Sequence, residues 1–314
     1  MKIINVLLIL ILLLAGFYGY FFLNNYILKE KEFNFLEINK KIEVNASSEL
    51  VQFSKNMRFA KNNLSYHFLG VCEDNKKERM KKAFDILKKE VEVIDFFEID
   101  KKEADILIFC SEEVKKLEEE ENSIKFIAGE GGPRKFINLT PYSLILQGDI
   151  YLYSSQKRKE CESPLVELHE LLHVFGYDHI NDNGSILYPY LISCEQKLKE
   201  NIINDLKKLY SEEAKAEIIL SNVSATKKGL YLNFEIEIKN EGLIEAKNVV
   251  LLVYANKEEV KKFDIGILKE GSSKILNVTN LYLSKLKIEE IAFKVNSDTE
   301  EYFYDNNIII LKNE

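Results

Sequence analysis

Residues 165–190, LVELHELLHVFGYDHINDNGSILYPY, hold three of the four histidines of this 314-residue chain. His169 and His173 are four positions apart, so on an α-helix their side chains lie on one face and reach a common metal ion. Gly176 is suited to end that helix in the left-handed conformation and to turn the chain back, which brings His179 to the same ion. The stretch therefore predicts a short, largely buried helix followed by a sharp bend.

Three neutral imidazoles and one water form a tetrahedral zinc site with an open catalytic position. Such an ion lowers the pKa of its water toward ~7. Glu170, next to the first histidine, is placed to take the proton of that water and to pass it to a leaving amine. The motif thus predicts metal-dependent hydrolysis of a peptide bond. The alternative is three core or surface histidines that bind no metal.

The string HELLHVFGYDH resembles the HExxHxxGxxH signature of the metzincin zinc peptidases, and the residues after it are similar to their matrixin branch. In that branch a methionine follows the third histidine by eight residues, in a tight turn beneath the metal, and precedes Tyr-Pro. Leu187, Tyr188 and Pro189 occupy these positions here. The resemblance implies that Leu187 forms the apolar floor of the site and that Tyr188 is structural. Because leucine and methionine have similar volumes, we expect the leucine to preserve the metal site but to tune it less finely.

The N-terminal residues 3–23, IINVLLILILLLAGFYGYFFL, form an uncharged apolar run that spans about 30 Å as a helix. We expect a single-pass transmembrane anchor at residues 1–23, a polar stalk at residues 24–58, and the bulk of the chain outside the cell. A cleaved signal peptide is the alternative, but its small-x-small exit site is not clear here. All four cysteines follow the anchor, and an even number of cysteines suits an oxidising exterior.

Residues 59–212 indicate one α+β domain built around the histidine motif. Apolar residues that recur every three or four positions from Met80 to Val91 predict an amphipathic helix between the first two strands. A crossover helix of this kind implies a largely parallel sheet, in which the first and third strands are neighbours. The strands are expected at 64–70, 94–99, 104–110, 123–128, 136–139 and 147–153, with a flexible glycine-rich loop at 129–133 and a last helix at about 192–210.

The order strand, helix, strand, strand is also similar to the N-terminal half of a matrixin catalytic domain. The resemblance implies a mixed five-stranded sheet with three helices, in which one antiparallel edge strand binds an extended peptide substrate through its backbone. Because the first and third strands are neighbours, Cys72 is expected near Cys110. Cys161 would then pair with Cys194, on the two sides of the helix that carries His169 and His173. Four cysteines allow three connectivities, and this pairing is the one we prefer.

Residues 213–314 differ from the preceding residues in their pattern of apolar and polar residues, and they predict an all-β, Ig-like sandwich. Apolar and mostly polar residues alternate from Leu230 to Lys239, which indicates a half-buried strand. The regular spacing of the other strands favours two packed sheets. The seven strands are expected at 217–220, 230–239, 249–254, 263–268, 274–278, 291–295 and 308–311. Strings such as FEIEIKNEGLIEAKNVV and YDNNIIIL resemble the CARDB adhesion modules of prokaryotic surface proteins.

The leading hypothesis is a membrane-anchored, extracellular zinc endopeptidase that acts on extended peptides. It uses one catalytic zinc, and the sequence leaves a role for calcium open. The formal charge of −8 and the absence of a basic stripe argue against a nucleic-acid partner. The alternatives are a surface adhesion protein with a weak or inactive peptidase domain, and a secreted enzyme released from its anchor.

Overall fold

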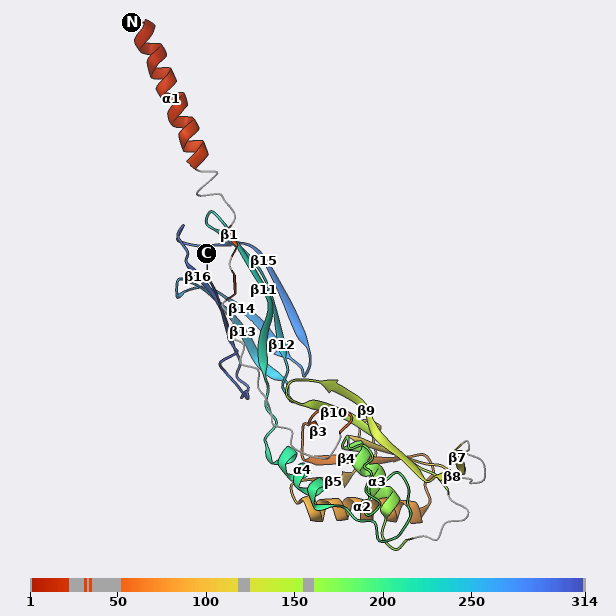
Figure 1. Ribbon diagram of the computed structural model, residues 1–314. Helices are drawn as coiled ribbons and strands as arrows, with labels where there is room; N and C mark the ends of the chain where they lie inside the picture. The colour runs from red at the N-terminus through yellow and green to blue at the C-terminus, as the bar shows by residue number, and fades with distance from the viewer. Residues whose placement is uncertain are drawn as a thin grey trace. The chain divides into compact units, whose positions relative to one another are not determined.

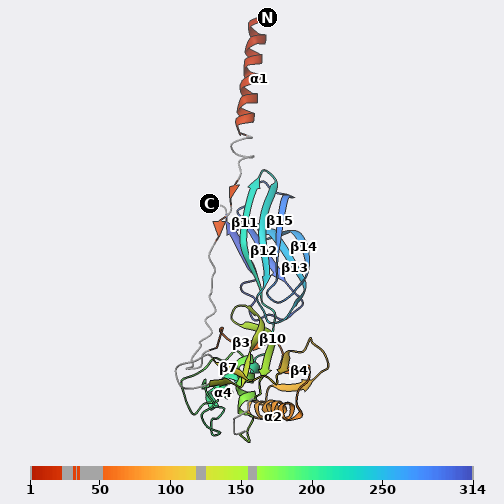
Figure 2. The same ribbon diagram turned by 90° about the vertical axis from the view of Figure 1, so that its right-hand side faces the viewer.

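The structure is a computed structural model that describes residues 2–22, 31–32, 34–35, 52–117, 125–154 and 161–312. The chain divides into two compact units, residues 41–214 and residues 1–40 with 215–314 (Figures 1 and 2). The first unit mixes helices with a largely parallel sheet, and the second is built from antiparallel strands. This division gives the expected α+β domain followed by an all-β domain.

The N-terminal helix α1 runs from Lys2 to Phe22. Among the residues that the structure describes, no helix combines the length and the apolar character needed to cross a membrane. The structure therefore gives no support to the transmembrane span expected at residues 1–23.

A six-stranded sheet forms the frame of the first unit, with the strand order β3-β10-β6-β4-β5. Among the described residues, strand β9 pairs with β10 alone, antiparallel, and so forms an edge of the sheet, whereas the other pairs of this sheet are parallel. The sheet has six strands instead of the expected five because residues just before the expected domain add β3. Its strands are β3 (Met57–Phe59), β4 (Asn63–Leu69), β5 (Asp95–Glu98), β6 (Ile106–Cys110), β9 (Gly129–Asn138) and β10 (Ser143–Leu152).

The predicted neighbourhood of the first and third strands is confirmed, since β4 and β6 pair in parallel. Cys72, three residues after β4, and Cys110, the last residue of β6, form one disulfide with a Cα–Cα distance of 5.1 Å. Cys161 and Cys194 form the other, with a Cα–Cα distance of 5.4 Å. Both preferred pairings are thus confirmed. A separate two-stranded sheet consists of β7 (Lys115–Leu117) and β8 (Lys125–Ile127).

The three helices of this unit are α2 (Asp74–Val91), α3 (Leu165–Val174) and α4 (Glu200–Ser211), and they gather on one side of the sheet (Figure 1). Helix α2 buries the apolar face predicted from its periodicity, including Met80 and Val91. The helix expected from residue 192 is wrong over its first eight residues. Cys194 is tied to Cys161 there, and the Lys197 backbone bonds to Gly184 and Ile186, so these backbone groups are not available to a helix.

The glycine-rich segment at 129–133 is the first half of strand β9, and the prediction of a flexible loop is wrong. Glycine is required here because β9 lies directly against helix α3. A Cβ atom on Gly129 would lie 2.7 Å from Cγ of Glu170, and one on Gly131 would overlap the Glu170 carbonyl oxygen. Close packing of a strand on helix α3 therefore explains a composition typical of loops.

The second unit has all seven strands expected from the sequence, arranged in two antiparallel sheets, β1-β11-β12-β15 and β14-β13-β16-β17-β2. Inward-facing apolar residues of both sheets, such as Phe234 and Phe293, form a common core. The seven strands are β11 (Ile218–Lys228), β12 (Tyr231–Asn240), β13 (Ala246–Ala255), β14 (Glu258–Leu268), β15 (Ser273–Tyr282), β16 (Glu290–Asn296) and β17 (Ile308–Lys312).

Within the expected stalk at 24–58, the described residues all take part in folded structure. Strand β1 (Lys31–Glu32) pairs with β11, and β2 (Asn34–Phe35) pairs with β17, so each adds a strand to a different sheet of the second unit. Residues 52–58 belong to the first unit, where the Gln52 side chain donates to the carbonyl oxygens of Met57 and Phe175. Open edges of sheets accept such short strands through backbone bonds, whatever their side chains.

Candidate metal centre

Helix α3 carries the first two histidines, and the turn after it delivers the third. Gly176 ends the helix with φ +87°, and its N–H donates to the His173 carbonyl oxygen over 2.9 Å. A Cβ atom on Gly176 would lie 2.8 Å from Cβ of Met57, so the site demands glycine for space as well as for conformation. The chain then turns back and brings His179 over the exposed face of the helix.

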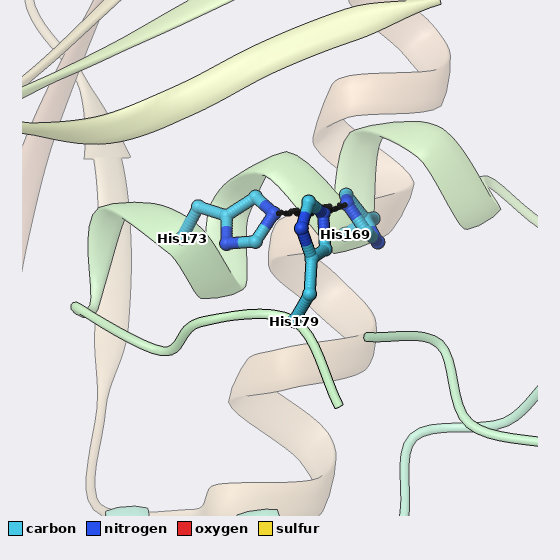
Figure 3. Close-up of side chains that lie close together, drawn as sticks. All are labelled: His169, His173 and His179. Atoms are coloured by element: carbon cyan, nitrogen blue, oxygen red, sulfur yellow. Dashed lines mark hydrogen bonds between the residues drawn. The ribbon is translucent and has the colours of Figure 1, made fainter. Parts of the chain in front are cut away.

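The three imidazoles converge through their Nε2 atoms (Figure 3). The Nε2 atoms of His169 and His173 are 2.9 Å apart, and each lies 3.2 Å from Nε2 of His179. A tetrahedral zinc ion with bonds of about 2.0–2.1 Å separates its nitrogen ligands by about 3.4 Å. The spacing of the three donors therefore fits one shared ion.

Backbone carbonyls fix the orientation of two of these rings. Nδ1 of His169 lies 2.6 Å from the Ile186 carbonyl oxygen, and Nδ1 of His173 lies 2.6 Å from that of Tyr177. A carbonyl oxygen only accepts, so each Nδ1 carries the proton and each Nε2 presents its lone pair to the centre. This is the tautomer that a metal ligand needs.

Burial favours the neutral form of all three rings. It lowers the pKa of His169 to about 4, and the neighbouring His173 adds to the effect. Burial also lowers the pKa of His173 and of His179. Because metal binding requires unprotonated imidazole, the site offers its donors in the competent state at neutral pH.

Glu170 lies beside the histidines on α3 and is buried, with 6 % of its surface exposed. Burial raises the pKa of its carboxyl to about 8, and the charges of Glu130 and Glu167 raise it further, while an N–H bond from Gly131 acts in the opposite direction. A buried carboxyl whose pKa lies near neutrality is suited to take up and to release a proton.

The turn expected beneath the site is present. Leu187 is fully buried, and its carbonyl oxygen accepts from the Ile180 N–H at 3.0 Å, which ties this turn to the residue after His179. The Ser185 hydroxyl accepts from the Leu187 N–H at 3.2 Å. Tyr188 and Pro189, the other two residues of the predicted turn, line the cavity in front of the histidines.

That cavity has a volume of about 970 Å³. One wall is the start of β9, residues 129–131, and another is the segment Tyr190–Gln196, both beyond the motif from which the site was predicted. Phe53 lies 6.0 Å from the His173 ring, centroid to centroid. Its position within the expected stalk gave no signal of this contact, because the contact joins residues far apart in the sequence.

Comparison with known families agrees with the geometry. Residues 58–211 match the matrixin family model. This segment is a matrixin domain. Residues 217–308 match the CARDB family model, which covers the strands from β11 to the start of β17. The chain has no significant match among the curated proteins.

The matrixin domain begins at β3 and ends with α4. Hydrogen bonds join this first strand to the end of the last helix. The buried Arg58 side chain joins them, with a bond of 2.9 Å from its guanidinium to the Glu212 carbonyl oxygen. The Tyr210 hydroxyl accepts from the Phe59 N–H at 2.9 Å. Tyr177, in the turn between His173 and His179, donates to Asp205 of α4 over 2.7 Å. Helix α4 therefore supports both the sheet edge and the bend that carries His179.

Proposed function

We propose that the matrixin domain is a zinc-dependent endopeptidase. The observation that supports this most directly is the convergence of three Nε2 atoms within 2.9–3.2 Å, beside a buried glutamate. Two histidines with protonated Nδ1 atoms aim their lone pairs at one point, which serves no purpose in a core without a cation. His169, His173 and His179 are the proposed zinc ligands.

His169, His173 and His179 would hold a zinc ion, which would lower the pKa of its water toward ~7 and polarise a carbonyl group. The Glu170 carboxylate accepts the proton of that water and then gives it to the amine that leaves when the peptide bond breaks. The Gly131 N–H bonds to this carboxyl and holds it in place. Leu187 forms the apolar floor beneath the ligands.

Substrate binding is assigned to the free edge of β9. An extended peptide adds there as a further strand through backbone hydrogen bonds, which gives affinity with few demands on sequence. Gly129 and Gly131 allow this strand to lie directly against helix α3, which carries Glu170. Mutation of the other wall of the cavity, the segment Tyr190–Gln196, is then expected to change selectivity more than the chemical step.

The cellular location is a separate proposal, and its basis is the sequence. Residues 3–23 are apolar and uncharged, so we infer a single-pass anchor that leaves the bulk of the chain outside the cell. Membrane fractionation, protease treatment of intact cells and sequencing of the mature N-terminus test this. A soluble protein whose N-terminus starts after residue 23 would overturn the anchor and leave a secreted enzyme.

A surface adhesion protein with a weak peptidase domain is the competing proposal. The CARDB match supports it, as does Leu187 in place of the methionine of other matrixins. It predicts bound metal without useful turnover. The two proposals therefore differ in activity and agree on zinc content.

The test uses the purified full chain with Glu170→Ala and, as a matched control, Glu98→Ala, which removes an exposed carboxylate from β5. Elemental analysis is expected to give about one zinc per chain in all three proteins. Wild type and Glu98→Ala are expected to cut casein or a peptide library, with inhibition by a chelator. Equal cleavage by Glu170→Ala and wild type, or no cleavage by any of them, would end the peptidase proposal.

A further inference from the structure

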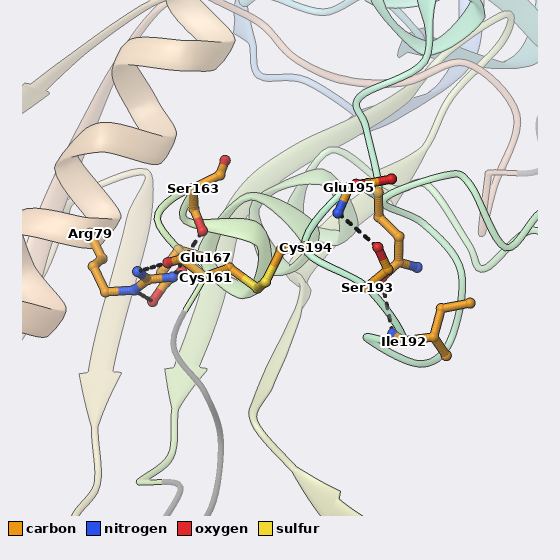
Figure 4. The surroundings of a disulfide bond; sticks show 9 residues. Arg79, Cys161, Ser163, Glu167, Ile192, Ser193, Cys194 and Glu195 are labelled. Carbon is orange, nitrogen blue, oxygen red and sulfur yellow. Dashed lines mark hydrogen bonds and ion pairs between the residues drawn. A yellow bond between two sulfur atoms is a disulfide. The ribbon is translucent and has the colours of Figure 1, made fainter.

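We propose that the Cys161–Cys194 disulfide holds one wall of the substrate cavity in place and so determines which substrate side chains enter. The proposal rests on the peptidase function above and names a determinant of its selectivity. Both cysteines line the cavity that contains the three histidines. Their bond joins the residues just before α3 to the segment Tyr190–Gln196 (Figure 4).

The Tyr190–Gln196 segment contains no helix or strand, so its position depends on cross-links and not on a backbone ladder. Gln196 provides one set of cross-linking hydrogen bonds. Its side chain accepts from the Ile192 N–H at 3.1 Å and donates to the carbonyl oxygens of Tyr190 and Ser185. These bonds hold the segment to itself and to the turn before Leu187. The disulfide is the covalent link between the segment and the chain that leads into α3.

The surface of this wall is apolar. The side chains of Tyr190, Leu191 and Ile192 are 46 %, 38 % and 57 % exposed, and all three residues line the cavity. Leu165 and Val166, at the start of α3, line the same cavity. The distance between these two apolar surfaces sets the size of the apolar side chain that fits between them, and the disulfide connects the chain segments that carry them.

Helix α3 is attached to helix α2 independently of the disulfide. Arg79 of α2 donates to both carboxylate oxygens of Glu167 at 2.9 and 3.2 Å, and also to the carbonyl oxygens of Cys161 and Ser163 (Figure 4). The start of α3 therefore stays seated on α2 when the disulfide is absent. The carbonyl partners of the histidines, Ile186 and Tyr177, lie outside the wall segment. Loss of the disulfide is thus expected to move the wall and to leave the metal ligands in place.

The experiment compares the full chain with Cys161→Ser/Cys194→Ser and with Cys72→Ser/Cys110→Ser. The second pair is a matched control, because it removes the other disulfide, whose cysteines do not line the cavity. Substrates are peptides that differ at one position beside the cleaved bond, with alanine, leucine or 4-phenylphenylalanine. Zinc content and amide hydrogen exchange of residues 190–196 are measured in parallel.

Removal of the Cys161–Cys194 bond is expected to shift the ratio of kcat/KM between the largest and smallest side chain by about tenfold, mainly through KM. Exchange at residues 190–196 is expected to rise, with about one zinc retained. The control pair is expected to keep the wild-type ratio. An unchanged ratio in the first variant overturns the proposal, and so does joint loss of zinc and activity, which would make the bond a support of the metal site. Absence of cleavage by wild type would instead sink the peptidase function itself.

A second arm does not require the Cys161→Ser/Cys194→Ser variant to fold. In folded Cys72→Ser/Cys110→Ser, a water-soluble phosphine reduces the one remaining disulfide, of which Cys194 is exposed. The phosphine gives two electrons to the sulfur atoms and takes oxygen from water, whose two protons complete the two thiols. The same shift in selectivity is expected, and reoxidation should reverse it. Alkylation of two thiols without any shift in selectivity would contradict the proposal.

Discussion

The Nδ1 atom of His169 lies 2.6 Å from the carbonyl oxygen of Ile186, and this contact joins helix α3 to the turn that contains Leu187. Ile186 precedes Leu187, whose side chain is fully buried. The packing of Leu187 therefore positions the carbonyl that orients His169, a proposed zinc ligand. An apolar residue at position 187 can therefore support the site without touching the ion.

Leu187→Ala is expected to destabilise the matrixin domain by about 2–5 kcal/mol, because it leaves a cavity in a filled site. A shift of the Ile186 carbonyl also loosens His169, so zinc affinity is expected to fall about 10- to 100-fold. Thermal unfolding and competition with a zinc chelator measure the two effects. Leu187→Met is the control, since a swap of similar volume costs less than about 1.5 kcal/mol. Equal zinc affinity for the alanine variant and wild type would contradict this role of the floor.

Gly131→Ala is expected to reduce kcat/KM about 100-fold, because displacement of the reacting groups by about 1 Å has an effect of this size. Its Cβ atom would overlap the backbone of Glu170, so β9 must move away from α3. Gly132→Ala serves as control on the same strand, since no atom of the described residues lies within 4 Å of its Cβ position. Steady-state kinetics of both variants on one peptide measure the effect. Similar losses at the two positions would show that β9 does not depend on this close approach.

Arg79→Ala is expected to cost about 3–5 kcal/mol, because it leaves the buried Glu167 carboxylate without its partner. The side chains of this pair are 14 % and 9 % exposed. Lys81→Ala, on the same helix, breaks a pair with Glu98 that is 47 % and 45 % exposed, and is expected to cost about 0–1 kcal/mol. Urea unfolding of both variants measures the difference. The prediction is wrong if the two changes cost the same.

Glu217 makes the stability of the second unit depend on pH. Burial raises the pKa of its carboxyl from about 4.5 to about 7, and the charge of Glu301 contributes. Because the folded-state pKa is the higher one, the stability from this group is complete below pH 4.5 and is lost as the pH rises through about 7. The loss amounts to at most about 3 kcal/mol. Burial raises the pKa of Glu301 too, so that group acts in the same direction.

Calorimetry of the full chain at pH 5 and pH 8 checks this dependence. Glu217→Gln is expected to reduce the difference in stability between the two values. Glu235→Gln, which changes an exposed carboxylate on β12, is expected to preserve it. Identical pH dependence in wild type and Glu217→Gln would rule out this carboxyl as the source.

Features set by contacts between near neighbours in the chain could be predicted from the sequence. The histidines at positions 169, 173 and 179 lie within eleven residues, so helix geometry and one glycine turn suffice to bring them together. The alternation at 230–239 likewise gave strand β12, because one buried face imposes a period of two on its own residues. Local spacing also gave the strand order from which the disulfides were paired.

Features that depend on distant segments were decided only by the tertiary structure. Glycines at 129–132 have the composition of a loop, and they form a strand because α3 lies against them. Residues 192–199 were expected to be helical, and the disulfide to Cys161 and the pairing with the Leu187 turn hold them in another conformation. Strands β1 and β2 exist only through partners about 195 and 275 residues away in sequence. The sequence by itself thus determined the convergence of the three histidines, because their spacing is a local property, whereas the cavity around them required long-range packing that no local pattern encodes.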